Sequence, residues 1–284
     1  MAIRKKAEVE FPQLSQDLIW QVSSGAHHDP HSVLGAHPHE KGWVIRALRP
    51  MAKSVTAVLF DSPAVELEHL ENGLWQGFVK SKKTPDYRLN AKYAGEGGDV
   101  DWTVDDAYRH LPTIGELDLH LIKEGRHEEL WKVLGSHLIS IKGADGTSHG
   151  CSFAVWAPNA KAVRVVGDFN HWSGIGHAMR VMGSSGVWEL FIPGIEVGTH
   201  YKYEILTQDG NWISKIDPLA RQTETPPSTA SIVTDSSYDW NDKAWLAARS
   251  KRDALKSPMS IYELHAGSWR QGLDYRGLAD ELIP

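Results

Sequence analysis

The chain has 284 residues, of which 41% are hydrophobic and 23% charged, a balance that permits large buried cores and a length typical of about two domains. Its formal net charge is −6 and no cluster of Lys and Arg stands out, which argues against nucleic acid as a partner. No apolar run approaches the roughly 20 residues of a membrane span, and the N-terminal segment lacks the apolar core of a signal peptide. The single cysteine, Cys151, excludes an internal disulfide and fits a reducing compartment. We therefore expect a cytoplasmic protein with neither nucleic acid nor membrane as a partner.

The sequence contains an internal repeat with a spacing of 100 residues. The matching residues are Gly25, His27, Val33, Leu34, Gly35 and His37 in the first copy and Gly125, His127, Val133, Leu134, Gly135 and His137 in the second. Segments 43–61, 71–79 and 86–93 then resemble 151–169, 184–192 and 200–207 in the same order. Matches in four successive segments predict two copies of one module.

Each copy opens with a predicted short helix. In the first, Ser15 is the expected N-cap, Leu14 and Ile19 have the spacing of a hydrophobic staple, and Gly25 ends the helix. In the second, the apolar residues within 116–124 predict a helix that ends at the equivalent glycine.

Strands follow each helix. Short β-branched or alternating runs predict them at 44–48, 55–60, 152–156, 162–166 and 187–192. Turn residues separate these runs at the spacing of a β-sandwich, so we expect a mainly β fold in which each module is an immunoglobulin-like antiparallel sandwich of about 100 residues. We expect about three-quarters of the twelve tryptophans to lie in cores, because buried Trp dominates packing in such sandwiches.

A linker helix is expected after the second sandwich, whose pattern fades through 223–233. Asp239 or Asn241 is the expected N-cap, Trp245 and Leu246 form the apolar side, and the helix stops before Pro258.

Three segments resemble those of a known family. The segment FAVWAPNAKAVRVVGDFNHW (153–172), together with 186–194 and 201–205, resembles the glycogen-binding sandwich of carbohydrate-binding module family 48. The segment SIYELHAGSWR (260–270) resembles the first barrel strand of 1,4-α-glucan branching enzymes in glycoside hydrolase family 13, and HDPHSVLGAHP (28–38) resembles their additional N-terminal module. The resemblance covers nearly the whole chain.

The resemblance implies a layout of four parts. These are an N-terminal sandwich in 1–112, a family 48 sandwich in 113–238, a linker helix in 239–259 and the first strand of a truncated (β/α)8 barrel in 260–284, with the boundary between the sandwiches near 110–115.

The resemblance also implies a reaction. The family transfers a segment of α-1,4-glucan to a 6-hydroxyl and forms an α-1,6 branch with retention. Retention needs two carboxyl groups about 5 Å apart, and in this family they lie at the ends of middle strands of a barrel of about 250 residues. The catalytic carboxylates are therefore expected to be missing. We assign no catalytic residue, interpret Glu263 as a structural carboxylate at a strand end, and expect a part of a branching enzyme that is inactive alone.

In glycogen-binding sandwiches of this type, two aromatic faces and a lysine form the sugar site. The matching residues are Trp172, Lys202 and Trp212, and the adjacent Asn211 is a candidate hydrogen-bond partner for a sugar hydroxyl. The expected partner is an α-glucan such as glycogen or a maltooligosaccharide, bound by a monomer without a cofactor. The competing interpretation is a module that keeps the fold without using this site. Trp188 alternates with apolar residues and is expected to pack in the core.

The first module has LFDSPAVE where the second has GDFNHW, so we expect it to be a structural spacer without a sugar site. A segment rich in histidine precedes these strands and contains His27, His28, His31, His37 and His39. No cysteine or helical ladder of histidines accompanies them, so we expect turn or packing roles and no metal site.

Two other functions stay open. One is a stand-alone glycogen-binding or targeting protein, like the glycogen-binding subunits of kinases. The other is a fragment of a related debranching or trehalose-releasing enzyme. The barrel-like segment after residue 260 favours the branching enzyme, because a binding protein has no need of a barrel strand.

Overall fold

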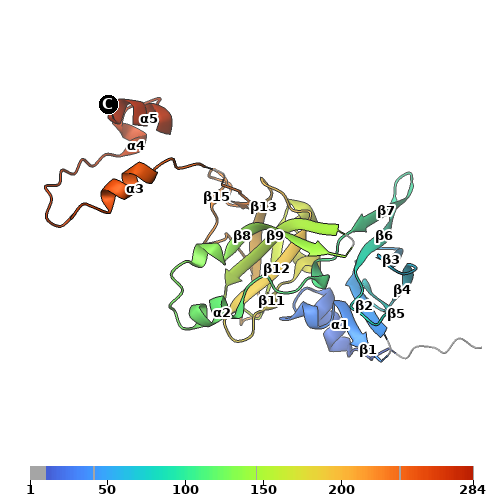
Figure 1. The fold of residues 1–284 in the computed structure, drawn as a ribbon. Helices are drawn as coiled ribbons and strands as arrows, with labels where there is room; N and C mark the ends of the chain where they lie inside the picture. The colour runs from blue at the N-terminus through green and yellow to red at the C-terminus, as the bar shows by residue number, and fades with distance from the viewer. Residues whose placement is uncertain (1–10, 41, 145, 237, 284) are drawn as a thin grey trace, which may run out of the picture. The chain divides into compact units, whose positions relative to one another are not determined.

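The computed structural model describes residues 11–40, 42–144, 146–236 and 238–283. The chain divides after Ser236 into two units, and each is described by itself. The first unit contains two β-sandwiches in succession (Figure 1). Within the described ranges, no helix is both long enough and apolar enough to cross a membrane.

The first sandwich begins with a helix and is otherwise antiparallel. Its elements are α1 (Gln16–Ser23), the 3₁₀ turn η1 (Pro30–Ser32), β1 (Gly35–His39), β2 (Gly42–Leu48), β3 (Ser54–Leu59), β4 (Val65–His69), β5 (Leu74–Val79), β6 (Tyr87–Gly95), β7 (Gly98–Val104) and η2 (Ala107–Arg109). The strands follow the order β1-β2-β5-β4-β3-β6-β7. Their inward side chains, among them Ile45, Val55, Leu67 and Trp75, form a separate core.

The second sandwich repeats this plan with two distinct sheets. Its elements are α2 (Glu116–Lys123), η3 (Leu130–Lys132), β8 (Gly135–Gly143), β9 (Gly146–Trp156), β10 (Ala162–Gly167), η4 (Asp168–Asn170), η5 (Gly174–His177), β11 (Arg180–Val181), β12 (Val187–Pro193), β13 (His200–Leu206), β14 (Trp212–Lys215), β15 (Gln222–Thr223) and β16 (Ser231–Ile232). One sheet has the order β11-β12-β9-β8 and the other β10-β13-β16-β15, with β14 paired to β13. The five predicted strands correspond to β2, β3, β9, β10 and β12, and the predicted sandwich fold is confirmed.

The predicted helix ends are also confirmed. The Ser15 hydroxyl accepts a hydrogen bond from the Leu18 amide at 3.2 Å and so caps α1. Gly25 follows the last turn with φ of +67°, and Gly125 follows α2 with the same value. This left-handed conformation costs glycine little because it has no Cβ, which explains why both helices end there.

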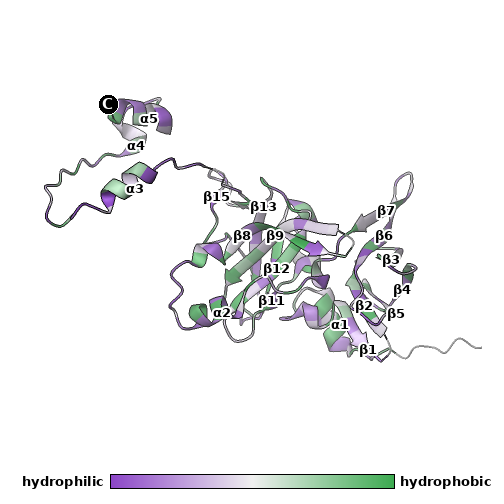
Figure 2. Cartoon of the chain, viewed as in Figure 1, coloured by the Kyte–Doolittle hydropathy of each residue, from purple (hydrophilic) through white to green (hydrophobic). Residues whose placement is uncertain are grey.

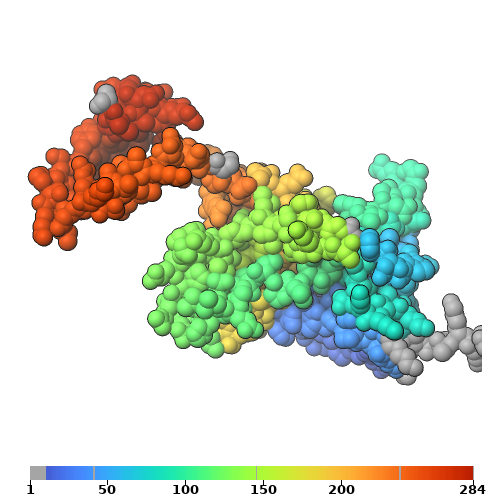
Figure 3. Space-filling view, in the orientation of Figure 1, coloured from blue at the N-terminus to red at the C-terminus, as the bar shows by residue number. Residues whose placement is uncertain are grey.

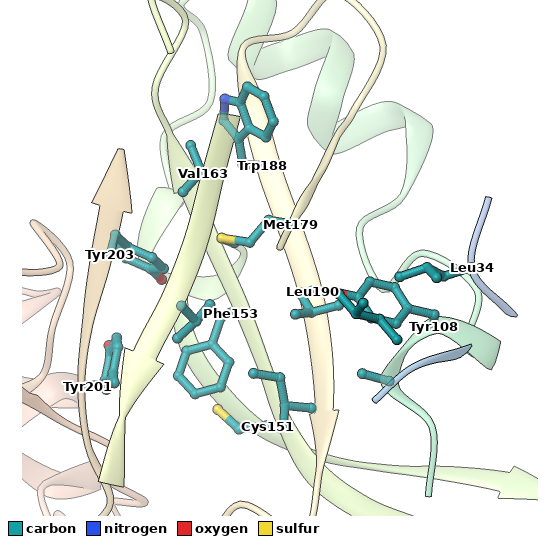
Figure 4. Packing of buried hydrophobic residues seen from close by; sticks show 14 of the residues in the cluster. Leu34, Tyr108, Cys151, Phe153, Val163, Met179, Trp188, Leu190, Tyr201 and Tyr203 are labelled. Atoms are coloured by element: carbon teal, nitrogen blue, oxygen red, sulfur yellow. The ribbon is translucent and has the colours of Figure 1, made fainter. Parts of the chain in front are cut away.

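The core of the second sandwich is shared with the first module. Leu34 and Tyr108, which lie on either side of the first module's strands in the chain, pack beside Leu190 of β12 (Figure 4). The Tyr108 hydroxyl lies within hydrogen-bond distance of the carbonyl oxygens of Gly176 and Ala178, at 3.2 Å each. The two modules are therefore joined by buried apolar packing as well as by the chain.

The expectation that about three-quarters of the tryptophans lie in cores is wrong. Trp75 and Trp188 are 6% and 2% exposed, which confirms the packing role of Trp188. Trp20, Trp102, Trp131, Trp156, Trp172, Trp240 and Trp245 are all exposed. Apolar residues also occur on the helices, as Figure 2 shows for α1 and α2, and Ile19 and Val22 of α1 belong to the shared core.

The second unit contains the helices α3 (Lys243–Arg249), α4 (Ala266–Trp269) and α5 (Tyr275–Leu282). The N-cap of α3 is Asp242, without a capping side-chain hydrogen bond, rather than Asp239 or Asn241. The predicted barrel strand does not form: residues 260–265 have no regular structure, and Ile261 and Tyr262 are 83% and 69% exposed. A strand needs a neighbour for its backbone hydrogen bonds, and residues 238–283 contain no other strand.

Candidate functional site

The candidate sugar site lies on the outer face of the sheet that contains β10, β13 and β14. Tyr201 and Tyr203 of β13 are fully buried in the core. Because side chains alternate along a strand, Lys202 and Glu204 point to the opposite, outer face. Arg164 of β10 lies directly opposite Glu204 and shares this face.

Trp212 of β14 lies opposite Leu206 and is on the same face. The guanidinium of Arg164 stacks over its ring at 3.7 Å from the ring centre, a cation–π contact. Arg164 is itself held by the Glu204 carboxylate at 2.6 Å and by the Ser24 carbonyl oxygen at 3.0 Å. One face of the indole is thus occupied, and a sugar could stack only on the other.

Lys202 lies further along the same face. Its side chain is partly exposed, and its ammonium donates a hydrogen bond to the Thr229 hydroxyl at 2.7 Å. Leu206, which pairs with Trp212, is four residues away along β13, about 13 Å for an extended strand. This separation suits an extended ligand of several sugar units rather than a single ring.

Trp172 lies in the loop after β10, near the other end of the face. The residue is 43% exposed and its backbone has φ of +59°. Burial disfavours the charged form of Asp168, but hydrogen bonds from the backbone and ring of His200 and from Trp172 outweigh this and hold the pKa of Asp168 below its usual value. These contacts tie the Trp172 loop to the start of β13.

Asn211 is in the turn between β13 and β14. Its amide donates to the Thr207 hydroxyl at 3.3 Å, and its carbonyl oxygen accepts from the Thr207 amide at 2.9 Å. The turn is exposed, so the Asn211 side chain lies at the surface next to Trp212.

The structure therefore brings Lys202 and Trp212 to one sheet face and places Asn211 at its edge. Trp172 lies at the end of this face that is far from Trp212. The sequence argument missed Arg164, which decides how much of Trp212 is free. Its signal was present as the one charged residue in the apolar run AVRVV of β10. The available chemistry is ring stacking and hydrogen bonding, which is the chemistry of binding.

Two of the histidines in 27–39 form hydrogen bonds with backbone groups close to them in the chain. The His27 ring accepts the Asp29 amide at 3.1 Å, and the His37 ring bonds the Leu34 carbonyl oxygen at 3.0 Å. In the described part of the chain, no group of three or more His, Cys, Asp and Glu side chains is arranged to hold a metal ion.

Comparison with known families first defines the class of the modules. Residues 133–220 match the model of carbohydrate-binding module 48 (isoamylase N-terminal domain), which makes the second sandwich a module of the carbohydrate-binding class. Residues 15–108 match the N-terminal domain of the alpha-1,4-glucan branching enzyme GlgB. The chain thus contains a GlgB-type N-terminal domain followed by a family 48 carbohydrate-binding module.

Individual relatives agree with this assignment. The chain is 54% identical over 92% of its length to the 1,4-alpha-glucan branching enzyme GlgB of Rhodococcus jostii, 52% over 99% to that of Thermobifida fusca, and 51% over 96% to that of Leifsonia xyli. It covers only 35%, 39% and 37% of these proteins. A pullulanase from Bacillus acidopullulyticus has a TM-score of 0.30 and 16% identity over 70% of this chain and 27% of its own, too low to bear on function.

Proposed function

We propose that this chain is the N-terminal part of a retaining 1,4-α-glucan branching enzyme, for which it supplies glucan-binding and scaffold modules. The observation that carries the proposal is the identity of 51–54% with branching enzymes across more than nine-tenths of the chain. The same proposal includes a cytoplasmic protein that acts as a monomer on glycogen or maltooligosaccharides.

Residues 1–284 alone do not branch glucan. A retaining reaction needs two carboxyl groups about 5 Å apart, held by a rigid scaffold such as the strands of a barrel. The described residues 238–283 contain three short helices and no strand that could begin such a sheet. In this proposal the chain contributes substrate binding, and the catalytic pair lies outside it.

The test is incubation with amylose, followed through the iodine spectrum and the content of α-1,6 linkages. We expect no change for the 284-residue protein and branching for the full-length enzyme. Branching by the short protein above a heat-inactivated control would contradict the proposal. Glucan retention by both proteins without branching by either would instead favour a targeting module.

Within this function, the glucan site is proposed to be the outer face that carries Lys202, Asn211 and Trp212, extended by Trp172 at its far end. Three features support it: an exposed indole, a second indole that is partly exposed and has Arg164 over one face, and a lysine ammonium that can donate to hydroxyls. The first sandwich is proposed to be a spacer, and the four-part layout of 1–112, 113–238, 239–259 and 260–284 is kept as a proposal.

A further inference from the structure

Arg164 of β10 connects the first module to the outer sheet face of the second. Its Nε donates to the Glu204 carboxylate at 2.6 Å, and its Nη1 donates to the Ser24 carbonyl oxygen at 3.0 Å. The flat guanidinium also lies over the Trp212 ring, 3.7 Å from the ring centre. Ser24 is the C-cap of α1 in the first module, whereas Glu204 and Trp212 belong to strands of the second sandwich. The group that packs on the indole is therefore held in part by the first module.

The stem of Arg164 is also enclosed by both modules. A Cβ placed on Gly174 of the second module would lie 2.6 Å from its Cγ, and a Cβ placed on Gly25 of the first would lie 3.4 Å from its Cδ. The Arg164 side chain is only 13% exposed. In Figure 3 the blue segment that contains α1 lies against the second sandwich. A long side chain that is otherwise flexible is thus fixed where the two modules meet.

The first sandwich shows that the fold does not need this arrangement. The equivalent Tyr87 and Tyr201 align the two sets of paired strands. The positions of Arg164, Glu204 and Trp212 then correspond to Thr56, Asn90 and Asp101. The first sandwich lacks the guanidinium, its carboxylate partner and the indole at these positions. The second has all three together, on the face that is proposed to bind glucan.

Trp212 benefits from such support because of where it lies. It begins β14, a strand of four residues that pairs with β13, and its side chain is only partly buried. A side chain that is free to rotate loses this freedom when a ligand stacks on it, and the loss weakens binding. An indole that is already held by a cation–π contact with a fixed guanidinium loses less.

We propose that Arg164 is a positioning residue of the glucan site, and that the first module raises the affinity of the second for glucan by holding Arg164 over Trp212. The first module then contributes to binding although it has no sugar site of its own. The inference rests on the proposed function for the identity of the ligand, an α-glucan chain that stacks on Trp212.

The first experiment replaces Arg164 in the 284-residue protein and measures retention in gels that contain glycogen. Arg164→Met keeps an apolar stem but removes the charge and every hydrogen-bond donor. The association constant should fall about two- to tenfold, the range expected when a ligand must immobilise one more side chain. Arg164→Lys should not restore it, because an ammonium lacks the planar fork that bonds Glu204 and Ser24 while it stacks on an indole.

A pair of glycines tests the contribution of the first module. Gly25 and Gly125 both have φ of +67°, so a Cβ strains the backbone at both positions and both alanine variants should melt at a lower temperature. At Gly25 the Cβ would press on Ile175 and on the stem of Arg164, whereas at Gly125 it would meet nothing within 4 Å. Gly25→Ala should therefore lower the association constant about twofold or more. Gly125→Ala should leave it unchanged.

The indole N–H resonance of Trp212, identified by its absence in Trp212→Phe, reports on the ring without glucan. In Arg164→Met and Gly25→Ala this resonance should shift, and its nitrogen relaxation should show faster motion of the ring on the picosecond to nanosecond timescale. In Gly125→Ala neither should change. A purely stabilising role of Arg164 would lower the melting temperature and leave the resonance where it is.

Unchanged affinity in Arg164→Met and Gly25→Ala, with glucan bound by the unsubstituted protein, would overturn the inference and leave the proposed function intact. Equal losses of affinity in Gly25→Ala and Gly125→Ala would also overturn it, because backbone strain would then be the cause. If Arg164→Met does not fold, the two glycine variants still decide. Absence of glucan binding by the unsubstituted protein would instead refute the proposed glucan site itself, and the role of Arg164 with it.

Discussion

The outer sheet faces of the two sandwiches differ at the positions proposed to bind sugar, although β6 and β7 of the first correspond to β13 and β14 of the second. The register places Arg88 and Asp101 of the first sandwich where the second has Lys202 and Trp212. Asp101 forms an ion pair with Lys92 at 4.0 Å. The first face thus carries paired charges where the second carries an indole.

The residues proposed to bind glucan point outward, whereas the residues that the two sandwiches share point into the cores. Inward positions such as Tyr87 and Tyr201 keep the same hydrogen bond to an aspartate in both sandwiches. Outward positions do not touch the core, so they can exchange an aromatic residue for a charge at little cost in stability. The same fold is therefore compatible with either set of outward residues.

The largest expected effect concerns the two cores. Trp75 and Trp188 are equivalent, and each donates its ring N–H to a backbone carbonyl oxygen, of Arg49 at 3.2 Å and of Ala157 at 3.0 Å. Trp188→Ala should lower the free energy of unfolding by about 3–5 kcal/mol, because it removes packed volume and leaves a cavity. Urea unfolding measures the loss. The exposed Trp156→Ala is the control and should cost far less.

Trp75→Ala should lower the free energy of unfolding by a similar amount, but it should weaken the first sandwich alone. Trp75 belongs to the separate core of that sandwich, whereas Trp188 packs in the core that the two modules share. Hydrogen exchange can locate the weakened region. If Trp188→Ala cost less than about 1 kcal/mol, the shared core would not be the main stabilising element.

The second prediction contrasts His31 with its counterpart Trp131, which is 52% exposed. Burial, with smaller contributions from Arg180, His110 and His37, lowers the pKa of His31 to about 2. Within the described residues, neither ring nitrogen of His31 has a hydrogen-bond partner. Its ring packs edge-on against Tyr108 with centres 5.1 Å apart, where the two modules meet.

The unfolded chain takes up a proton at His31 near pH 6.5, whereas the folded chain does so only near pH 2. The stabilisation that comes from keeping His31 neutral is therefore fully present above about pH 6.5, and it is lost as the pH is lowered toward 2. His31→Leu should flatten the dependence of the melting temperature on pH in this window. His120→Gln, at an exposed position, should not. An unchanged pH profile for His31→Leu would show that other groups carry the acid sensitivity.

Much of the fold could be predicted because its signals are local. The strands alternate in polarity, Ser15 and Gly25 mark the ends of one helix, and the repeat is visible in the residue spacing. The burial of α1 could not be predicted, because α1 and α2 have similar apolar patterns and differ only in what covers them. For the same reason, the number of tryptophans in the sequence overestimated the number in the cores, because burial of a side chain depends on what packs against it.

The site was predicted by residue type but not by arrangement. That Lys202 and Trp212 share a face follows from the pairing of Trp212 with Leu206, which only the register reveals. Arg164 gains its importance from contacts with Ser24 and Trp212, which lie far from it in sequence. The barrel strand expected within 260–284 does not form for a related reason, because a strand needs neighbouring strands for its backbone hydrogen bonds.

The smallest expected effect is on glucan binding itself. We expect the second sandwich to bind glycogen or maltooligosaccharides with a dissociation constant in the high micromolar to millimolar range, about −4 to −6 kcal/mol. Two stacking faces and a few hydrogen bonds give a binding free energy only slightly larger than the cost of association. The many chain ends of glycogen compensate for this weak affinity through avidity. Trp172→Ala and Trp212→Ala should each weaken retention in affinity electrophoresis, by about 1–2 kcal/mol if a stacked ring is lost.

Trp102→Ala supplies the control, because Trp102 is an exposed tryptophan, at 58%, on the first sandwich. It should leave retention unchanged if the first sandwich is a spacer. Melting temperatures must accompany these measurements, since Trp212→Ala also releases Arg164, whose guanidinium holds the Ser24 carbonyl oxygen of the first module. Unchanged retention in Trp172→Ala and Trp212→Ala, with both proteins folded, would remove the glucan site from this sheet face. Loss of retention in Trp102→Ala would move it to the first sandwich and reverse the comparison between the two.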